Sequence, residues 1–395
     1  MEAEIQTDPT FSNRGILLTG ATGFLGREIL GRLLERGDAR IFALVRARGQ
    51  AQAEARLRET ISSLPGRIDP DSGSVTAVPA DLCTPNLGLS ESQRERLASR
   101  VTHVIHAAAS VSFELGLRES RTINVDGTRR VLDLAGLAAL RGGLDCFTHI
   151  STAYVAGMHR GRFGDEDFDL GQGFRNSYER SKFEAEALVR SRAELPVQVL
   201  RPSIVVGDSR TGWTPAFNVI YWPLRAFARG AYPVLPTRRS AAVDVVPVDY
   251  VADATVALAG RPGTTFNLVA GERASDAGEL VDLASSYFET PPPRLIPPRI
   301  YRSVLHPILV RSGSERRRRA LRRSEPFFPY FDVRTRYEDR ATREALAPHR
   351  LEAPQLRSYF DRLMDFAVAA DWGRRPAPAA RTRAGWAGIR NPSPA

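Results

Sequence analysis

Short apolar runs of strand length alternate with amphipathic stretches along the first half of the chain. Between the runs, apolar residues recur at spacings of three and four, which predicts helices, for example at 51–64 and 120–140. Strands separated by helices of this length predict an α/β fold with a parallel, doubly wound sheet. The expected strands are 16–19, 41–45, 75–78, 101–106, 144–150 and 197–200.

The regular pattern ends beyond residue 201. The segment 213–236 is rich in aromatic residues and prolines and is long for a plain connection. A strand and a helix return at 243–258, and three prolines at 291–293 indicate a boundary. We expect 299–373 to be helical and basic. The predicted organisation is a flexible leader at 1–13, a sheet domain at 14–270, a smaller, partly helical C-terminal region at 271–373 and a disordered tail at 374–395.

Composition narrows the protein class. The chain contains no apolar run of 18 residues, so a membrane-spanning helix is not expected. Its first residues are polar and show no apolar core of a secretory signal. Cys83 and Cys146 are too few for a disulfide framework or a metal knuckle. These features predict a reduced, cytoplasmic protein without a metal site.

The net charge of +10 is concentrated late in the chain, at Arg311 and in the run 316–319 with Arg322 and Arg323. One interpretation is a solvated, basic helix face. The other is attraction to an acidic carrier protein, a phosphate-bearing substrate or a membrane surface. Aromatic residues of the kind that stack on bases do not interrupt this run, so nucleic acid is not an expected partner.

A glycine-rich turn follows the first strand and begins the first helix. Gly20, Gly23 and Gly26 permit a tight turn, close approach of the backbone to a pyrophosphate, and packing of the helix on the strand. The helix N-terminus then offers free N–H groups to the phosphates. In this context the glycines predict a dinucleotide site on a Rossmann-type sheet. The expected contacts are Gly20, Thr22, Gly23, Phe24, Leu25 and Gly26.

The end of the second strand indicates which dinucleotide binds. An NAD site usually has an acidic residue there for the ribose hydroxyl, whereas an arginine suits the 2′-phosphate of NADP(H). Arg46, with Arg48 as a second candidate, therefore predicts NADP(H), although surface arginines are common in this chain. The residues after the next two strands complete the expected cofactor site: Asp81 and Leu82, and Ala107 and Ala108.

Tyr178 and Lys182 are the candidate catalytic pair. Residues four apart share one face of a helix, so the ammonium can lower the high pKa of the phenol. Thr152, after the strand at 144–150, can hold a carbonyl oxygen. Lys182 is the single lysine among 55 basic residues, and only three of these lie four positions after a tyrosine. The position of this lysine therefore favours a role that arginine does not fill, the alternative being that one lysine survived a biased codon usage.

Over about residues 15–270, the glycine turn, the HAAAS and STAYVAG segments, the YERSK motif and Arg201-Pro202-Ser203 together resemble the extended short-chain dehydrogenase/reductase superfamily. This resemblance implies catalytic roles for Thr152, Tyr178 and Lys182, and a supporting role for Asn124. It also implies that Tyr178 and Lys182, with Pro202 and Ser203, contact the cofactor.

A narrower resemblance concerns the segments at 44–47, 81–90 and 174–178, which are similar to the thioester reductase and fatty acyl-CoA reductase ("male sterility") branch. That branch reduces acyl thioesters on CoA or a carrier protein to aldehydes or alcohols with NADPH. The resemblance thus implies an acyl-CoA or acyl carrier protein substrate. The C-terminal 100 residues match no module that the resemblance explains.

Several alternatives remain open. The apolar side chains between 213 and 236 either line an acyl tunnel or form the core of the smaller region; they are Phe217, Ile220, Tyr221, Trp222, Leu224 and Phe227. The same catalytic residues occur in dehydrogenases, epimerases and dehydratases of sugar nucleotides or steroids. A cofactor sensor without turnover is a third hypothesis, although the retained Tyr178 and Lys182 oppose it.

Overall fold

A computed structural model describes residues 14–64, 73–217, 219–230, 234–305 and 330–375, with single positions at 307, 311 and 315. The chain divides into two compact units, each built from non-consecutive segments. Unit 1 comprises 1–152, 180–201 and 252–266, and unit 2 comprises 153–179, 202–251 and 267–395. The sequence predicts one boundary near residue 270, whereas segments of the two units alternate along the chain.

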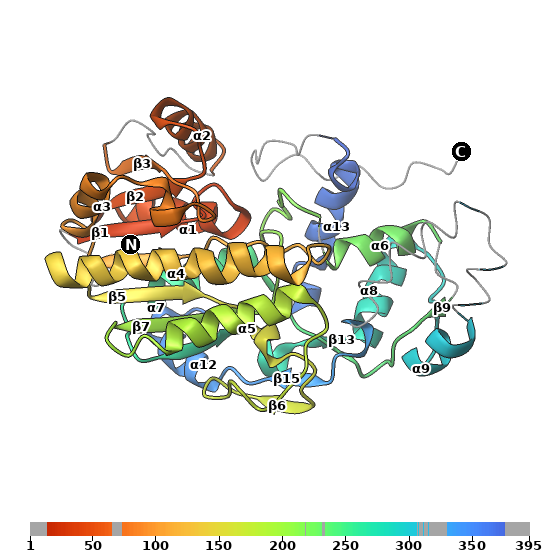
Figure 1. The fold of residues 1–395 in the computed structure, drawn as a ribbon. Helices are drawn as coiled ribbons and strands as arrows, with labels where there is room; N and C mark the ends of the chain where they lie inside the picture. Colours follow the sequence, from red (N-terminus) through yellow and green to blue (C-terminus); the bar gives the residue numbers. More distant parts are fainter. Residues whose placement is uncertain are drawn as a thin grey trace. The chain divides into compact units, whose positions relative to one another are not determined.

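Unit 1 is built on the parallel sheet that the sequence predicts. Its strand order is β12-β7-β5-β4-β1-β2-β3, the order of a doubly wound Rossmann-type sheet. The α/β fold class is therefore confirmed (Figure 1). The strands are β1 (Arg14–Thr19), β2 (Ala39–Val45), β3 (Val75–Pro79), β4 (His103–His106), β5 (Cys146–Ile150), β7 (Val197–Pro202) and β12 (Thr265–Leu268).

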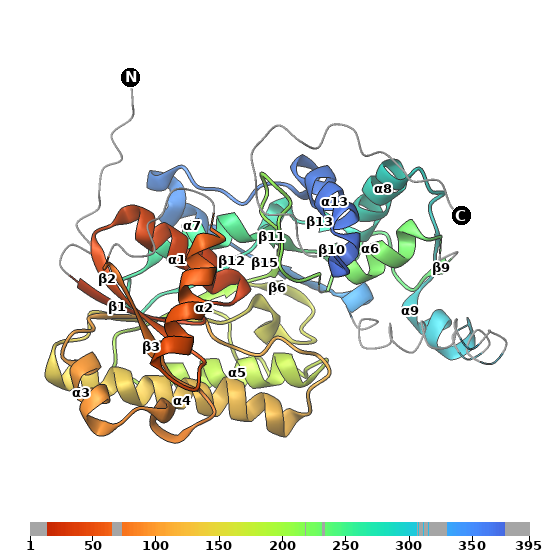
Figure 2. The ribbon, with the colours of Figure 1, turned by 90° about the horizontal axis from the view of Figure 1, so that it is seen from above.

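Helices cover both faces of this sheet because its strands are apolar on both sides. Ile16 and Leu18 of β1 pack with α1 (Phe24–Arg36), α2 (Gln50–Ser62) and the later part of α7 (Val248–Leu258). Leu17 points to the other face, which is covered by α3 (Glu91–Ala98), α4 (Leu117–Arg141) and α5 (Ser177–Arg190). Figure 2 shows α4 and α5 on one side of the sheet and α1 on the other.

Unit 2 contains short paired strands and a separate apolar core. Side chains of α6 (Tyr221–Ala228) and α13 (Phe360–Ala369) form this core together with α8 (Ala277–Phe288). Among the described residues of this unit, three strand pairs are parallel: β8 (Ile204–Val206) with β11 (Val245–Pro247), β6 (Gly161–Phe163) with β15 (Thr335–Tyr337), and β9 (Val234–Leu235) with β14 (Arg294–Leu295). One pair, β10 (Ala242–Val243) with β13 (Ser275–Asp276), is antiparallel.

The region expected to be helical at 299–373 is more varied than its sequence pattern suggests. It contains α9 (Pro298–Ile300), a π-helical turn at Tyr301–Leu305, α12 (Arg340–Leu346) and α13, but also the strand β15. Thr335 of β15 pairs with Gly161, far away in sequence, and such pairing leaves no local signal. The expected leader, the arginine run 316–323 and all but the first two residues of the expected tail lie outside the described residues.

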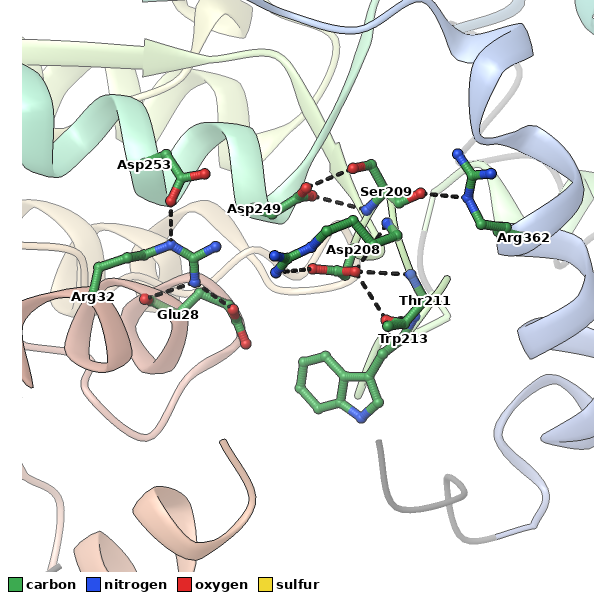
Figure 3. A network of polar contacts seen from close by, with 10 residues as sticks. Glu28, Arg32, Asp208, Ser209, Thr211, Trp213, Asp249, Asp253 and Arg362 are labelled. Atoms are coloured by element: carbon green, nitrogen blue, oxygen red, sulfur yellow. Dashed lines mark hydrogen bonds and ion pairs between the residues drawn. The ribbon is translucent and has the colours of Figure 1, made fainter. Parts of the chain in front are cut away.

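Helix α7 carries two carboxylates four residues apart, and each belongs to a different unit. In unit 1, Asp253 accepts a hydrogen bond from Nε of Arg32 at 2.6 Å, while Glu28 pairs with the same guanidinium at 2.7 Å. In unit 2, Asp249 accepts from the backbone N–H and the hydroxyl of Ser209, at 2.8 and 2.6 Å (Figure 3). These bonds hold α7 to helix α1 and to the loop after β8, respectively.

None of the helices in the described part of the chain is both long enough and apolar enough to cross a membrane.

Candidate active site

The glycine-rich turn in unit 1 has no space for a side chain at Gly20 or Gly26. Gly20 has φ of +76°, and a Cβ there would lie 2.9 Å from the backbone nitrogen of Ala108. A Cβ on Gly26 would lie 2.0 Å from the carbonyl oxygen of Gly20. That carbonyl also accepts a hydrogen bond from the N–H of Gly23 at 2.8 Å, where α1 begins. The turn is thus a bare-backbone cradle at a helix N-terminus, as pyrophosphate binding requires.

A buried chain of hydrogen bonds joins the glycine turn to the end of β4. The hydroxyl of Thr128 donates to the carbonyl of Asn124 at 2.6 Å, so it accepts from Nε2–H of His106 at 3.0 Å. Nδ1 of His106 then accepts from the hydroxyl of Thr19 at 2.8 Å, and the Thr19 oxygen accepts from the N–H of Ala108 at 3.1 Å. This order fixes one histidine tautomer and holds Ala108 beside Gly20.

Asn124 on α4 joins two segments that border the expected site. Its Oδ1 accepts from the N–H of Ser110 at 2.8 Å, and its Nδ2 donates to the carbonyl of Ser110 at 3.1 Å. The same Nδ2 donates to the hydroxyl of Ser181 at 2.9 Å, next to Lys182 on α5. Helices α4 and α5 lie side by side on this face of the sheet (Figure 1), and Arg121 pairs with Glu184 between them at 2.6 Å. Asn124 therefore connects Ser110 to Ser181, the neighbour of Lys182.

Lys182 is almost fully buried, and its ammonium lies at the end of β5. Nζ donates to the carbonyl of Ile150 at 2.8 Å and lies 3.4 Å from Nε2 of His149. Burial lowers the pKa of Lys182 to about 8, although the charge of Glu186 acts in the opposite direction. Burial, and then the charge of Lys182, lowers the pKa of His106 to about 3 and that of His149 well below its ordinary value. Both histidines are neutral at physiological pH.

Glu186, one turn after Lys182, is a buried anion of the site. It accepts from Nη2 of Arg201 at 2.6 Å, from Nε of Arg190 at 2.9 Å and from the hydroxyl of Ser151 at 2.6 Å. Burial raises the pKa of this carboxyl, but the charge and hydrogen bonds of Arg201, the charge of Arg190 and the Ser151 hydroxyl together outweigh burial, so the pKa lies below its usual value. Glu186 therefore stays ionised and fixes α5 against β7 and the end of β5.

Tyr178 occupies the first turn of the same helix and belongs to unit 2. Oδ1 of Asn176 accepts from the N–H of Glu179 at 2.9 Å, which is the geometry of an N-cap residue. Tyr178 is therefore the second residue of a capped helix, and Lys182 follows one turn later, as the YxxxK spacing predicts. Tyr178 is half-buried.

The remaining predicted residues lie at the ends of strands. Arg46 and Arg48 follow β2 directly and both are exposed. Asp81 follows β3, where its carboxylate accepts from the N–H of Cys83 at 2.9 Å. Leu82 lies against Gly127, at which a Cβ would come within 3.1 Å of the Leu82 side chain. Thr152 is buried just after β5, and Pro202 and Ser203 are buried at the end of β7.

Apolar side chains of the segment 213–236 pack in the core of unit 2. Ile220, Tyr221, Leu224 and Phe227 are all buried in the core of unit 2, and Phe217 packs against it. Of the two interpretations left open for this segment, the packing supports a core for these side chains.

The sequence did not identify three groups of this site: His149, Thr128 and Glu186. A polar residue near the end of an apolar strand, two positions before Ser151, is the signal for His149. Glu186 lies four residues after Lys182 and therefore on the same helix face. No local pattern marks Thr128, because its role depends on where α4 meets β4.

Comparisons with known proteins agree with this geometry. The family model described as male sterility protein, an NAD-binding family, matches residues 18–255. The chain is 34% identical over 261 residues to the isonitrile lipopeptide synthase of Streptomyces coeruleorubidus, which covers 64% of this chain and 17% of that protein. It is 31% identical over 290 residues to fatty acyl-CoA reductase 1 of Mus musculus, covering 64% and 56%.

Among solved structures, the terminal R domain from the myxalamid PKS-NRPS biosynthetic pathway matches with a TM-score of 0.77 and 28% identity. The match covers 92% of this chain and 93% of that domain. In contrast, the chain spans only 17% and 56% of the two curated relatives.

Proposed function

This chain belongs to the male sterility protein family, and from that premise we propose that it reduces acyl thioesters with NADPH. Two features together support the proposal. One is the glycine turn with its bare backbone, and the other is a capped helix with Tyr178 and the buried Lys182. One relative is a fatty acyl-CoA reductase, and one similar structure is a terminal R domain of a PKS-NRPS pathway. An acyl thioester is the substrate class common to these two proteins.

The chain has an NAD(P)-binding Rossmann domain, and its residues fit NADPH. The turn at Gly20, Gly23 and Gly26 leaves backbone where a Cβ would otherwise lie, which suits a pyrophosphate. Arg46 at the end of β2 is exposed and suits a 2′-phosphate, and no acidic residue stands between it and Arg48. When bound, NADPH supplies the hydride.

In this proposal, residues of the chain bind the carbonyl oxygen of the substrate and supply the proton. We assign Thr152 and Tyr178 to hydrogen-bond the thioester carbonyl, and Tyr178 to donate a proton as that oxygen becomes negative. Lys182 would keep the phenol acidic through its positive charge. The balance is R–CO–SR′ + NADPH + H⁺ → R–CHO + R′SH + NADP⁺, in which the C–S bond breaks as the hemithioacetal releases the thiol.

The thiol R′SH is either CoA or the phosphopantetheine arm of a carrier protein in this proposal. The arginine run at 316–323, which lies outside the described residues, would favour an acidic carrier by its charge. The cytoplasmic location expected from the sequence belongs to this same proposal. The competing hypothesis, a sugar-nucleotide or steroid dehydrogenase, is disfavoured by Arg46, because those NAD enzymes usually have an acidic residue there.

The test is consumption of NADPH by the full chain against a panel of acyl-CoAs of different length, with the product identified as aldehyde or alcohol. We expect NADPH oxidation that depends on the thioester, together with release of one free thiol per acyl group reduced. Oxidation with sugar nucleotides or steroids but with no acyl thioester would overturn the proposal.

A further inference from the structure

The first turn of α5 is tied to a residue far along the chain. Asn176 caps the helix through its Oδ1, while its Nδ2 donates to the hydroxyl of Tyr330 at 2.7 Å. These two residues are 154 positions apart, and both belong to unit 2. Tyr178 lies between Asn176 and Glu179, so the contact is made immediately beside the proposed proton donor.

Tyr330 is held from several sides. Its hydroxyl is hydrogen-bonded to the carboxylate of Glu179, and the guanidinium of Arg175 lies 5.7 Å from the centre of its ring. Its ring also packs edge-on against Tyr154, with centroids 5.4 Å apart. Arg175 and Glu179 are themselves a buried ion pair at 3.2 Å, and the carboxylate accepts from the N–H of Arg175 at 2.8 Å. The helix start, the ion pair and Tyr330 therefore form one cluster.

The charged and titratable groups that face this cluster come from several elements. Arg175 and Glu179 flank the start of α5, and Tyr154 follows β5. Tyr337 comes from β15, and Asp244 from the segment before β11. Burial raises the pKa of Tyr330, as it raises the pKa of Tyr154, so both phenols remain neutral hydrogen-bond donors over the working pH range.

We propose that Tyr330 is a positioning residue that holds the capped first turn of α5, and through it the phenol of Tyr178. The proposal rests on the proposed catalytic role of Tyr178. Asn176 caps the helix with its oxygen while its amide nitrogen donates to Tyr330, so the Tyr330 hydroxyl favours this orientation of the amide. Without the hydroxyl, Glu179 also loses one of its buried donors. The turn that carries Tyr178 would then shift, and a displacement of about 1 Å at a catalytic group costs roughly 100-fold in rate.

The first experiment compares Tyr330→Phe with the matched control Tyr287→Phe in the full chain. The Tyr287 hydroxyl also donates to a carboxylate in unit 2, that of Asp365 at 2.6 Å, but it lies on α8. We expect kcat to fall about 10- to 100-fold in Tyr330→Phe, with NADPH affinity unchanged, and to stay within about twofold in Tyr287→Phe. Asn176→Ser, which keeps a capping oxygen but loses the donor to Tyr330, should resemble Tyr330→Phe.

The second experiment measures the phenol of Tyr178 directly. The chain has ten tyrosines, so carbon-13 labelling of their rings gives a tractable NMR spectrum, and the signal lost in Tyr178→Phe identifies Tyr178. We expect its titration midpoint to move in Tyr330→Phe and in Asn176→Ser, but not in Tyr287→Phe. An unchanged midpoint, or equal losses of kcat in Tyr330→Phe and Tyr287→Phe, would overturn the proposal. Should the wild-type chain reduce no acyl thioester, the proposed function fails, yet the titration still decides whether Tyr330 positions Tyr178.

Discussion

At the scale of single residues, the single lysine of the chain, Lys182, has a buried ammonium. Its Nζ fits between the carbonyl of Ile150 and the ring of His149, at the end of β5. Glu186 supplies a compensating charge one turn away, and the neighbouring histidine is neutral. A compact ammonium suits this space, whereas a guanidinium is longer, planar and forked.

Lys182→Arg should therefore lower kcat by orders of magnitude although it keeps the charge. Tyr178→Phe should be as damaging but leave NADPH binding nearly intact, because it removes only a hydroxyl. The control is Arg336→Lys, since Arg336 is an exposed residue of β15 and its exchange should be silent. The measurements are kcat and NADPH affinity. Full activity in Lys182→Arg would reject the mechanism.

Arg46 decides the cofactor in the proposed function. Arg46→Ala should weaken NADPH by about 1.5–3 kcal/mol, the contribution of one charged hydrogen bond, and leave NADH binding nearly unchanged. Dissociation constants for both cofactors, measured by fluorescence titration, test this. Equal losses for the two cofactors would show that Arg46 does not bind the 2′-phosphate.

At the scale of elements, the glycine turn connects β1 to α1 and forms the proposed pyrophosphate site. Its shape depends on contacts of backbone with backbone, which no side-chain rearrangement relieves. A Cβ at Gly26 would lie 2.0 Å from the Gly20 carbonyl oxygen, whereas a Cβ at Gly116 would meet nothing within 4 Å. Gly116 also has φ of −64°, which any residue adopts.

Gly26→Ala should accordingly distort the turn and lower NADPH affinity by at least tenfold, with a lower melting temperature. Gly116→Ala, the matched control at the start of α4, should change neither quantity measurably. Thermal unfolding with and without NADPH measures both effects. The cradle interpretation would fail if Gly26→Ala bound NADPH as tightly as the wild type does.

Helix α5 and strand β7 are joined by a buried ion pair that the sequence does not reveal. Glu186 and Arg201 both have side chains with no exposed surface. Glu186→Gln should cost about 3–5 kcal/mol in the free energy of unfolding, because it leaves a buried guanidinium uncompensated. Glu184→Gln on the same helix breaks half-exposed pairs with Arg121 and Arg180 and should cost about 0–1 kcal/mol. Urea unfolding compares the two; similar values would contradict this account.

At the scale of the whole molecule, the two units are assembled from alternating segments of one chain. Helix α5 begins in unit 2 with Tyr178 and continues in unit 1 with Lys182, so the two residues of the proposed catalytic pair belong to different units although they share one helix. Helix α7 does the same with Asp249 and Asp253 (Figure 3). Each of these two helices therefore contributes residues to both units.

The net charge of +10 is also a property of the whole molecule. If the chain acts on carrier-bound substrates, replacing the arginines of 316–319, Arg322 and Arg323 by glutamine should raise KM for the acyl carrier and flatten its dependence on ionic strength. KM for acyl-CoA of the same chain length is the internal control and should change less. Unchanged kinetics across ionic strength would make this run a solvated surface.

The sequence by itself determined the features that depend on local order. Apolar runs and glycine spacing predicted the parallel sheet and its cofactor turn, and the fold and family are confirmed by the strand order and the family match. The Tyr178–Lys182 spacing needs only one helix, which α5 provides. These signals span few residues because they reflect the periodicity of one helix or one strand.

Tertiary structure determined which segments that are distant in sequence contact one another. Three contacts join residues that are not neighbours in sequence. Asn176 donates to Tyr330, Glu186 pairs with Arg201, and β15 pairs with β6. Each of these residues is ordinary in its local context, so no periodicity marks it. Burial then changes the chemistry, as with Lys182, whose lowered pKa follows from the surroundings that the fold builds.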